Sequence, residues 1–213
     1  MIKKFFQNCR KPEGFVGRLM LASMNFGHSN ISKWGLSHLR AGNDTRVLDV
    51  GCGGGANIKR LLAMCPQGYV EGIDYSEQSV AASRKKNRAD LGKRCNVRQG
   101  SVSRLPYGGG GFDVVTAFET VYFWPDISSD FREVSRVLKP GGSFLICNEA
   151  GDPADETWTE RIDGMRIYSG SELVRLLTDA GFAVTVNDTQ GKGRLCIVAE
   201  KTAGPLRTRK REE

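Results

Sequence analysis

The stretch Arg46-Val47-Leu48-Asp49-Val50-Gly51-Cys52-Gly53-Gly54-Gly55 decides the fold of this chain. It begins as a short apolar run, which is typical of a buried strand. It ends in glycines, which allow a sharp turn and a close approach of the backbone to a ligand. Apolar residues at helical spacing follow, at Ile58, Leu61, Leu62 and Cys65. The stretch therefore predicts a strand, a glycine turn and a helix whose first N–H groups are free to bind a ligand.

Apolar runs and helical patterns alternate after this stretch, which is typical of a parallel sheet with crossover helices. Further parallel strands are predicted over 69–74, 96–99, 112–118 and 143–148. Helices are predicted from the N-cap Ser76 to about Leu91, over 127–138, and over 169–180. Two last strands, 182–187 and 195–200, are close enough in sequence to form an antiparallel pair.

The expected fold is an α/β, Rossmann-like, doubly wound sheet of seven strands. It is mostly parallel, with an antiparallel C-terminal strand and N-terminal cap helices. Residues 1–44 contain two helical patterns, around Phe15 to Leu21 and Ile31 to Leu39, which we expect to cap a cofactor cleft. Residues 45–202 are expected to form the cofactor-binding domain. The basic tail 203–213 is expected to be disordered.

The glycine turn alone fits two classes of cofactor. Gly51, Gly53 and Ala56 satisfy the G-x-G-x-x-G/A pattern of dinucleotide-binding folds. Asp74 ends the second predicted strand, where a carboxylate accepts hydrogen bonds from the ribose of either cofactor class. Asp49 separates the two classes, because a negative charge before the turn suits an amino group and a sulfonium better than a pyrophosphate. The antiparallel final pair also differs from an all-parallel dinucleotide fold.

Four segments, in order along the chain, resemble the motifs of the class I S-adenosylmethionine (SAM)-dependent methyltransferases. Val47 to Gly55 resembles the first motif, and Tyr69 to Ser76 resembles the second. Leu105-Pro106-Tyr107 with Phe112 to Val115 resembles the loop and fourth strand, and Arg136 to Gly142 resembles the turn into the fifth strand. The motif style is similar to that of the small-molecule branch that includes ubiquinone and menaquinone methyltransferases. The resemblance implies SAM as the cofactor.

The resemblance also implies roles for individual residues. The backbone of Gly51 and Gly53 would pass beside the methionine part of SAM, and Asp49 would reach its amino group. Asp74 would bind the ribose and Tyr75 would pack on the adenine. Where many relatives have an acidic residue after the third strand, this chain has Ser101, so Ser101 and the backbone of Val102 are the expected adenine contacts. Phe118 would line the floor near the sulfur.

Candidates for catalysis and acceptor binding are fewer. Glu119 follows the fourth strand and His28 lies between the two N-terminal helical patterns, so either could act as a base or orient the acceptor. Tyr122, Trp124 and Tyr168 are candidates for the wall of an acceptor pocket. Each of these residues has a structural alternative, as a cap or as part of the core.

Composition and charge limit the remaining classes. The six cysteines are scattered without a C-x-x-C pair, and the two histidines have no acidic or thiol pattern beside them, so neither a disulfide framework nor a metal site is predicted. No apolar run is long enough to span a membrane, and a cytoplasmic location is expected. The net charge of +7 arises partly from the predicted helix at 76–91 and from the tail, so a nucleic-acid substrate stays open.

The sequence is thus interpreted as a SAM-dependent methyltransferase that acts on a small molecule by in-line transfer. An RNA or protein methyltransferase, an NAD-type oxidoreductase and a non-catalytic SAM-binding regulator are the alternatives. Methyl transfer from a sulfonium needs alignment and exclusion of water more than a particular side chain. The absence of an obvious catalytic residue therefore does not argue against the leading interpretation.

Overall fold

The fold, seen in a computed structural model, is an α/β sheet with helices on both faces; residues 7, 12, 14, 17, 29–191 and 193–203 are described. The strands are β1 (Arg46–Val50), β2 (Tyr69–Asp74), β3 (Cys95–Gln99), β4 (Phe112–Phe118), β5 (Leu138–Asn148), β6 (Phe182–Gln190) and β7 (Arg194–Lys201). The helices are α3 (Ser29–Ser37), α4 (Ala56–Met64), α5 (Glu77–Lys86), α6 (Ile127–Val137) and α7 (Gly170–Asp179), with a short 3₁₀ turn η1 (Val121–Phe123).

The seven strands form one sheet in the order β3-β2-β1-β4-β5-β7-β6. All neighbours from β3 to β5 pair in parallel, whereas β7 pairs antiparallel with both β5 and β6. The predicted doubly wound, mostly parallel sheet is therefore confirmed. The strand order reverses between β1 and β4, and the carboxyl ends of strands at such a point form the usual ligand crevice of open α/β sheets.

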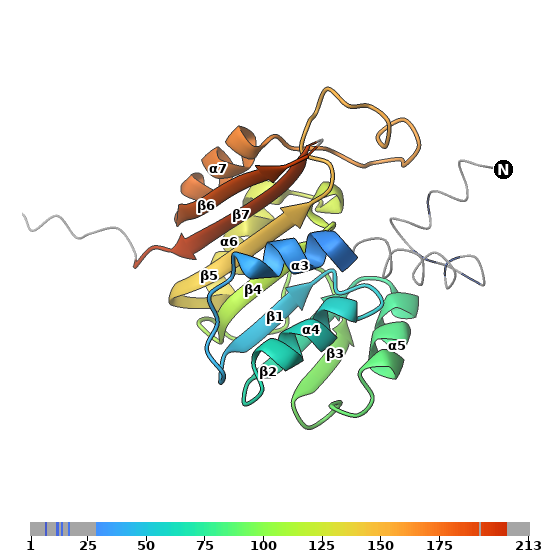
Figure 1. Cartoon of the computed structure of the whole chain (residues 1–213), viewed down its shortest axis with the longest axis vertical. Coiled ribbons are helices and arrows are strands. Elements are labelled where there is room, and N and C mark those ends of the chain that lie inside the picture. The colour runs from blue at the N-terminus through green and yellow to red at the C-terminus, as the bar shows by residue number, and fades with distance from the viewer. Residues whose placement is uncertain are drawn as a thin grey trace, which may run out of the picture.

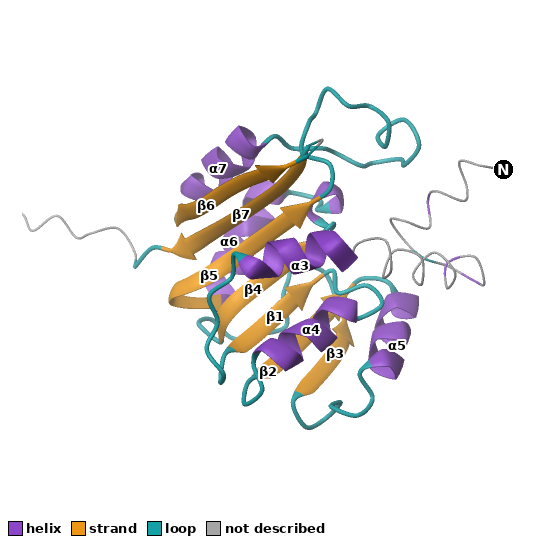
Figure 2. Ribbon diagram, viewed as in Figure 1, coloured by secondary structure: helices purple, strands orange, loops and turns teal. Residues whose placement is uncertain are grey.

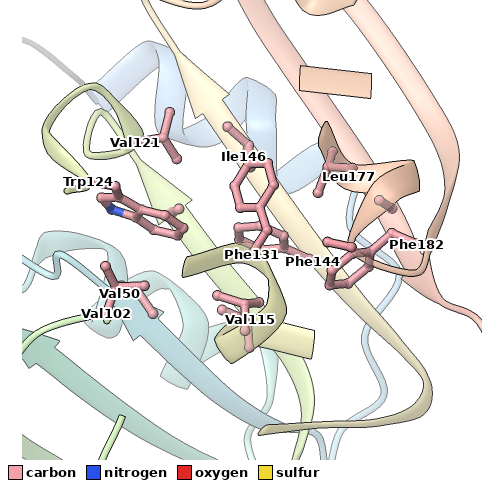
Figure 3. Close-up of a cluster of buried hydrophobic side chains, with 14 of the residues drawn as sticks. Val50, Val102, Val115, Val121, Trp124, Phe131, Phe144, Ile146, Leu177 and Phe182 are labelled. Atoms are coloured by element: carbon pink, nitrogen blue, oxygen red, sulfur yellow. The ribbon is translucent and has the colours of Figure 1, made fainter. Parts of the chain in front are cut away.

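Two hydrophobic clusters hold the helices on the two faces of the sheet. One cluster includes Ile58 and Leu61 of α4 and Val80 of α5. The other includes side chains of α6 and α7, with Phe131, Phe144 and Phe182 at its centre (Figure 3). Figure 1 shows α3 and α4 in front of the sheet and α6 behind it, and Figure 2 shows the same layers by element type. This layering leaves the carboxyl ends of β1 and β4 at one edge.

Three predicted boundaries differ from the structure. The helix α5 ends at Lys86 rather than near Leu91, because Asn87 caps it and turns its amide toward another segment. The strand β5 begins at Leu138, with a register shift around the turn of Gly141, which has a φ of 72°. The strand β6 continues to Gln190, because its polar last residues pair with β7. The last residues of β6 are polar and lie at the edge of the sheet, so the sequence there lacks the apolar run that predicts a strand.

Several other predictions concern burial and span. The described cysteines are buried and have free thiols: Cys52, Cys65, Cys95, Cys147 and Cys196. The helix predicted around Phe15 to Leu21 and the tail after residue 203 lie outside the described residues. No helix within the described ranges is long and apolar enough to cross a membrane.

Gly35 lets α3 lie directly on the sheet. A methyl group at Gly35 would come within 2.7 Å of Cys147 Sγ on β5 and within 2.9 Å of the Phe118 ring on β4. These distances are shorter than a van der Waals contact. The close approach of α3 therefore depends on the missing side chain.

We expect Gly35→Ala to lower the free energy of unfolding by about 1–3 kcal/mol, the usual cost of overpacking a core. Alanine favours a helix over glycine by roughly 0.5–1 kcal/mol, so the steric effect must exceed this gain. Urea denaturation measures the difference, and Lys33→Ala on the exposed side of α3 is the control. Equal or greater stability in Gly35→Ala would contradict the packing of α3 against β5.

Candidate functional site

The glycine turn leaves β1 and folds back against β2. The N–H groups of Gly51 and Cys52 both donate to the carbonyl oxygen of Ile73, at 2.8 and 3.1 Å. Gly51, Gly53 and Gly55 have φ angles of 72°, 49° and 75°, which favour glycine. The turn therefore has a fixed shape that other residues would adopt only under strain.

Asp74, at the end of β2, holds the turn from the other side. One carboxylate oxygen accepts the N–H of Gly53 at 2.9 Å, and the other accepts the N–H of Ser76 at 2.9 Å. Burial raises the pKa of Asp74, although these hydrogen bonds act in the opposite direction. The side chain thus joins the turn, the end of β2 and the start of α5 at one point.

Asp49 is a buried carboxyl group with one free oxygen. Its Oδ1 atom accepts the hydroxyl of Thr116 at 2.7 Å, whereas Oδ2 has no hydrogen-bond partner among the described residues. Burial raises the pKa of Asp49 to about 7, and the neighbouring Asp74 contributes in the same direction. A buried carboxyl group in this state gains most from a cation, because a positive charge repays the lost solvation of the carboxylate.

A cavity of about 340 Å³ opens beside the turn. It is lined by six of the predicted residues: Gly51, Asp74, Tyr75, Ser101, Val102 and Trp124. The Tyr75 side chain is 41% exposed and stands at the edge, whereas Val102 is buried. Figure 3 shows Trp124 on the same side of the hydrophobic cluster as Val50 and Val102, and all three residues line the cavity. The cavity has the apolar walls and few polar groups of a small-molecule site.

Thr120 also lines the cavity and was missed in the sequence. A methyl group at Gly51 would come within 2.2 Å of Thr120 Oγ1, so the residue after Glu119 lies directly against the glycine turn. The same oxygen accepts the indole N–H of Trp124 at 3.4 Å. Its position just beyond β4 was the one available signal, because parallel strands end at a common edge. Phe123 and Pro125 complete this wall.

Six predicted residues with described positions do not line this cavity: Asp49, Gly53, Phe118, Glu119, Tyr122 and Tyr168. Phe118 is buried in the cluster beneath α3, against Gly35. Tyr122 is buried, and its hydroxyl accepts the N–H of Ala150 at 2.9 Å. Tyr168 is buried in the other cluster, with the guanidinium of Arg166 4.7 Å from its ring centre. Their expected roles in cofactor or acceptor binding stay predictions, and His28 lies outside the described residues.

Glu119 has an unusual backbone and an unusual environment. Its φ is 57°, and its N–H donates to the carbonyl oxygen of Cys147 at 3.0 Å. Its carboxyl group accepts the N–H of Glu149 and a hydrogen bond from Tyr122. Burial raises the pKa of Glu119 to about 8, and the nearby charge of Glu149 adds to this shift. At neutral pH the side chain therefore carries its proton, and its catalytic role stays a prediction.

A second hollow of about 310 Å³ lies beyond Glu149, at the ends of β5 and the β6–β7 turn. Asp152, Asp155, Trp158 and Arg194 contribute to its walls. The Glu149 carboxylate pairs with Arg194 at 3.0 Å, while the Glu149 N–H donates to Glu119. Glu119 is thus connected to this hollow rather than to the wall of the larger cavity.

The few described residues before 29 contact two sides of the site. The hydroxyl of Ser76, at the start of α5, donates to the carbonyl oxygen of Pro12 at 3.4 Å. The side-chain amide of Gln7 donates to the carbonyl oxygen of Arg161, in the loop before α7, at 3.3 Å. The expected N-terminal cap over the cleft stays a prediction.

The sequence matches a known family model, described as a methyltransferase domain, over residues 48–146. The chain is 37% identical over 128 residues to 27-O-demethylrifamycin SV methyltransferase of Amycolatopsis mediterranei, covering 57% of this chain and 46% of that protein. It is 35% identical over 124 residues to demethylmenaquinone methyltransferase of Listeria welshimeri, covering 57% and 52%. The chain spans about half the length of these relatives.

A solved structure has the same fold. The SAM-dependent methyltransferase of Aquifex aeolicus superposes with a TM-score of 0.73 at 21% identity, covering 86% of this chain and 97% of the other. The match extends past the family model to most of the described chain. The order and directions of the strands above therefore belong to a known architecture.

The environment of Glu119 predicts a pH dependence of stability. Its pKa is higher in the folded protein than its ordinary value of 4.5, so the unfolded chain loses this proton first. Stability then falls as pH rises from about 5 to about 8. Glu119→Gln removes the ionisable group and keeps the hydrogen-bond acceptor. Between pH 5 and pH 8 the free energy of unfolding of this variant should therefore fall by on the order of 3–4 kcal/mol less than that of the natural protein.

Denaturant unfolding at pH 5, 6.5 and 8 measures this difference. The raised pKa of Asp49 acts equally in both proteins, so the comparison isolates Glu119. Parallel stability curves for the two proteins would show that the Glu119 carboxyl group ionises normally.

Proposed function

We propose, on the premise that this chain is a member of the class I SAM-dependent methyltransferases, that it transfers the methyl group of SAM to a small-molecule acceptor. The observation that carries the proposal is the free oxygen of Asp49, buried beside the glycine turn. A cationic ligand satisfies this oxygen, whereas a pyrophosphate would be repelled by it. The pair of Asp49 and Asp74 therefore favours SAM over a dinucleotide.

The larger cavity, together with Asp49 and Gly53 next to the residues that line it, fits SAM at each of its parts. Asp49 Oδ2 would accept a hydrogen bond from the ammonium group, directly or through water. The oxygens of Asp74 accept the N–H groups of Gly53 and Ser76 and have the Ser79 hydroxyl beside them. A carboxylate has about four acceptor sites, so one is left for a ribose hydroxyl. The exposed ring of Tyr75 would cover one face of the adenine. Gly51 and Gly53 leave room for the methionine part.

Ser101 would meet the adenine edge in place of an acidic residue. Its oxygen already accepts the N–H of Ser103 at 3.2 Å, so its own O–H is the group left to donate. A hydroxyl donor suits a ring nitrogen of adenine rather than the exocyclic amino group. The amino group would then bind to the backbone near Val102.

Bound SAM supplies a methyl group on a positively charged sulfur, which is already activated for displacement. The work of the protein is to align the acceptor with this group and to keep water away. Thr120, Phe123 and Trp124 form a rigid wall on the side where an acceptor would approach. Glu119 and Tyr122 do not line this cavity. Because Glu119 carries its proton at neutral pH, we assign these two side chains to positioning the wall that orients the acceptor, not to taking its proton.

A small organic acceptor is supported by the nature of the site and of the relatives. The walls of the cavity are largely apolar and aromatic, which suits an uncharged organic ligand. The named relatives act on a rifamycin and a menaquinone precursor. The basic residues near the end of α5 leave RNA or protein as the alternative acceptor, for which steep salt dependence of binding would be the sign.

Binding and turnover test the proposal directly. In isothermal titration we expect SAM and its demethylated product, S-adenosylhomocysteine, to bind and NADH not to bind. Incubation with SAM and a panel of phenols, hydroquinones and amines should release S-adenosylhomocysteine, detected by mass spectrometry. Tight binding of NADH without binding of SAM would overturn the assignment, and SAM binding without turnover on any acceptor would favour a regulator.

Asp49→Asn tests the observation that carries the proposal. The amide keeps the hydrogen bond to Thr116 but removes the charge, so SAM should bind more weakly by about 1.5–3 kcal/mol. The affinity of the natural protein should fall as pH drops below about 7, because the carboxyl group is then protonated, and the variant should lose this dependence. Asp113→Asn, at the opposite end of β4, is the matched control. Equal pH profiles in all three proteins would place Asp49 outside the ligand site.

A further inference from the structure

The helix α5 buries polar residues where a helix against a sheet normally buries apolar ones. Ser79 and Ser83 are 2% and 0% exposed, and Asn87, the C-cap, is 4% exposed. The three residues are four positions apart, so they lie in one line along the helix. A surface helix usually directs an apolar stripe to the core, because burying polar groups costs free energy unless they are paired. We call these three residues the α5 polar line.

Asn87 binds the end of the glycine turn. Its side-chain amide donates to the carbonyl oxygen of Gly55 at 3.1 Å and to that of Ser83 at 3.0 Å. The Gly55 carbonyl also accepts the N–H of Lys59, the first hydrogen bond of α4. Asn87 therefore fixes the point where the turn becomes a helix.

Ser83 lies directly beneath the same glycine. A methyl group at Gly55 would come within 2.4 Å of Ser83 Oγ and 2.5 Å of the Asn87 amide nitrogen. Gly55 also has a φ of 75°, so both space and backbone conformation require glycine there. The turn and α5 are thus packed too closely for any side chain at Gly55. The Ser83 hydroxyl itself has no hydrogen-bond partner among the described residues, so Ser83 supports the turn by contact and through its carbonyl oxygen, which accepts from Asn87.

Ser79 reaches the other end of the site. Its hydroxyl hydrogen-bonds with the carboxyl group of Asp74, which also accepts the N–H groups of Gly53 and Ser76. The α5 polar line thus contacts the turn at one end and the ribose-binding carboxylate at the other. None of its three members lines the cofactor cavity.

We propose that Ser79, Ser83 and Asn87 form a polar support that holds the glycine turn and Asp74 in the geometry required for cofactor binding. This inference rests on the proposed function, because the turn and Asp74 matter to it only as parts of a SAM site. The three side chains are positioning residues that act through Gly55 and Asp74. This role explains why α5 buries polar residues at these positions. Apolar side chains would fill the same space but would form no hydrogen bond to the turn.

The test measures the binding of S-adenosylhomocysteine to the full chain by isothermal titration. Asn87→Ala and Ser79→Ala should each raise the Kd about fivefold to tenfold, the factor for one lost hydrogen bond of about 1–1.4 kcal/mol. Ser79→Thr keeps the hydroxyl and should restore binding to within about twofold of the natural protein, since its hydrogen bond is retained. Ala81→Ser adds a hydroxyl to the exposed side of α5 and should leave the Kd unchanged.

A core variant separates positioning from general loss of stability. Leu176→Ala, on α7 at the far face of the sheet, should lower the thermal midpoint at least as much as Asn87→Ala, yet leave the Kd unchanged. Folded Asn87→Ala and Ser79→Ala proteins that bind like the natural one would overturn the inference, as would an equal loss of affinity in Leu176→Ala. If Asn87→Ala does not fold, the Ser79→Ala and Ser79→Thr pair decides. Failure of the natural protein to bind would instead overturn the proposed function.

Discussion

The site depends on the carboxylate of Asp74, which accepts the N–H of Gly53 with one oxygen and that of Ser76 with the other. These two hydrogen bonds join three segments that the sheet alone would leave independent: the turn after β1, the end of β2 and the start of α5. The carboxylate is buried, and a buried charge costs free energy unless hydrogen-bond donors such as these are paired with it. The same arrangement leaves lone pairs directed to the cavity, so one group serves both the fold and the ligand.

The buried carboxyl groups of this site would favour a positively charged ligand. Burial raises the pKa of both Asp49 and Asp74, and the charge of Asp74 raises the pKa of Asp49 further. Burying two like charges close together costs free energy. The cost is reasonable only if a positive ligand offsets it, which agrees with the accumulation of unusual electrostatics at functional sites. In the function proposed above, the glycine turn provides space for the ligand, and the two carboxylates select a positively charged ligand.

The bounds of a strand or helix can be predicted from the sequence where the pattern that sets them is local. The bounds of β1, β2 and β4 matched, because each is an apolar run limited by turn residues. The prediction is less accurate where a contact with a residue far away in the sequence sets the end of an element or the role of a side chain. Asn87 leaves the helix because Gly55, far away in the sequence, offers it a carbonyl group. Thr120 has meaning only beside Gly51, and the polar end of β6 has structure only beside β7. The partners in these contacts are not neighbours in the sequence, so a local pattern does not reveal them.

The contact between Gly51 and Thr120 limits how such a protein can diversify. No atom can be added to Gly51 without meeting the Thr120 side chain, and that side chain also supports the Trp124 indole. The glycine turn and the segment after β4 are therefore packed as one unit, in which a larger residue at Gly51 would require a change at Thr120. In the function proposed above, acceptor preference would be set by positions beyond this unit, such as Phe123, Pro125 and the loop before α7. A lineage built on this scaffold would keep its cofactor geometry constant while its acceptors change.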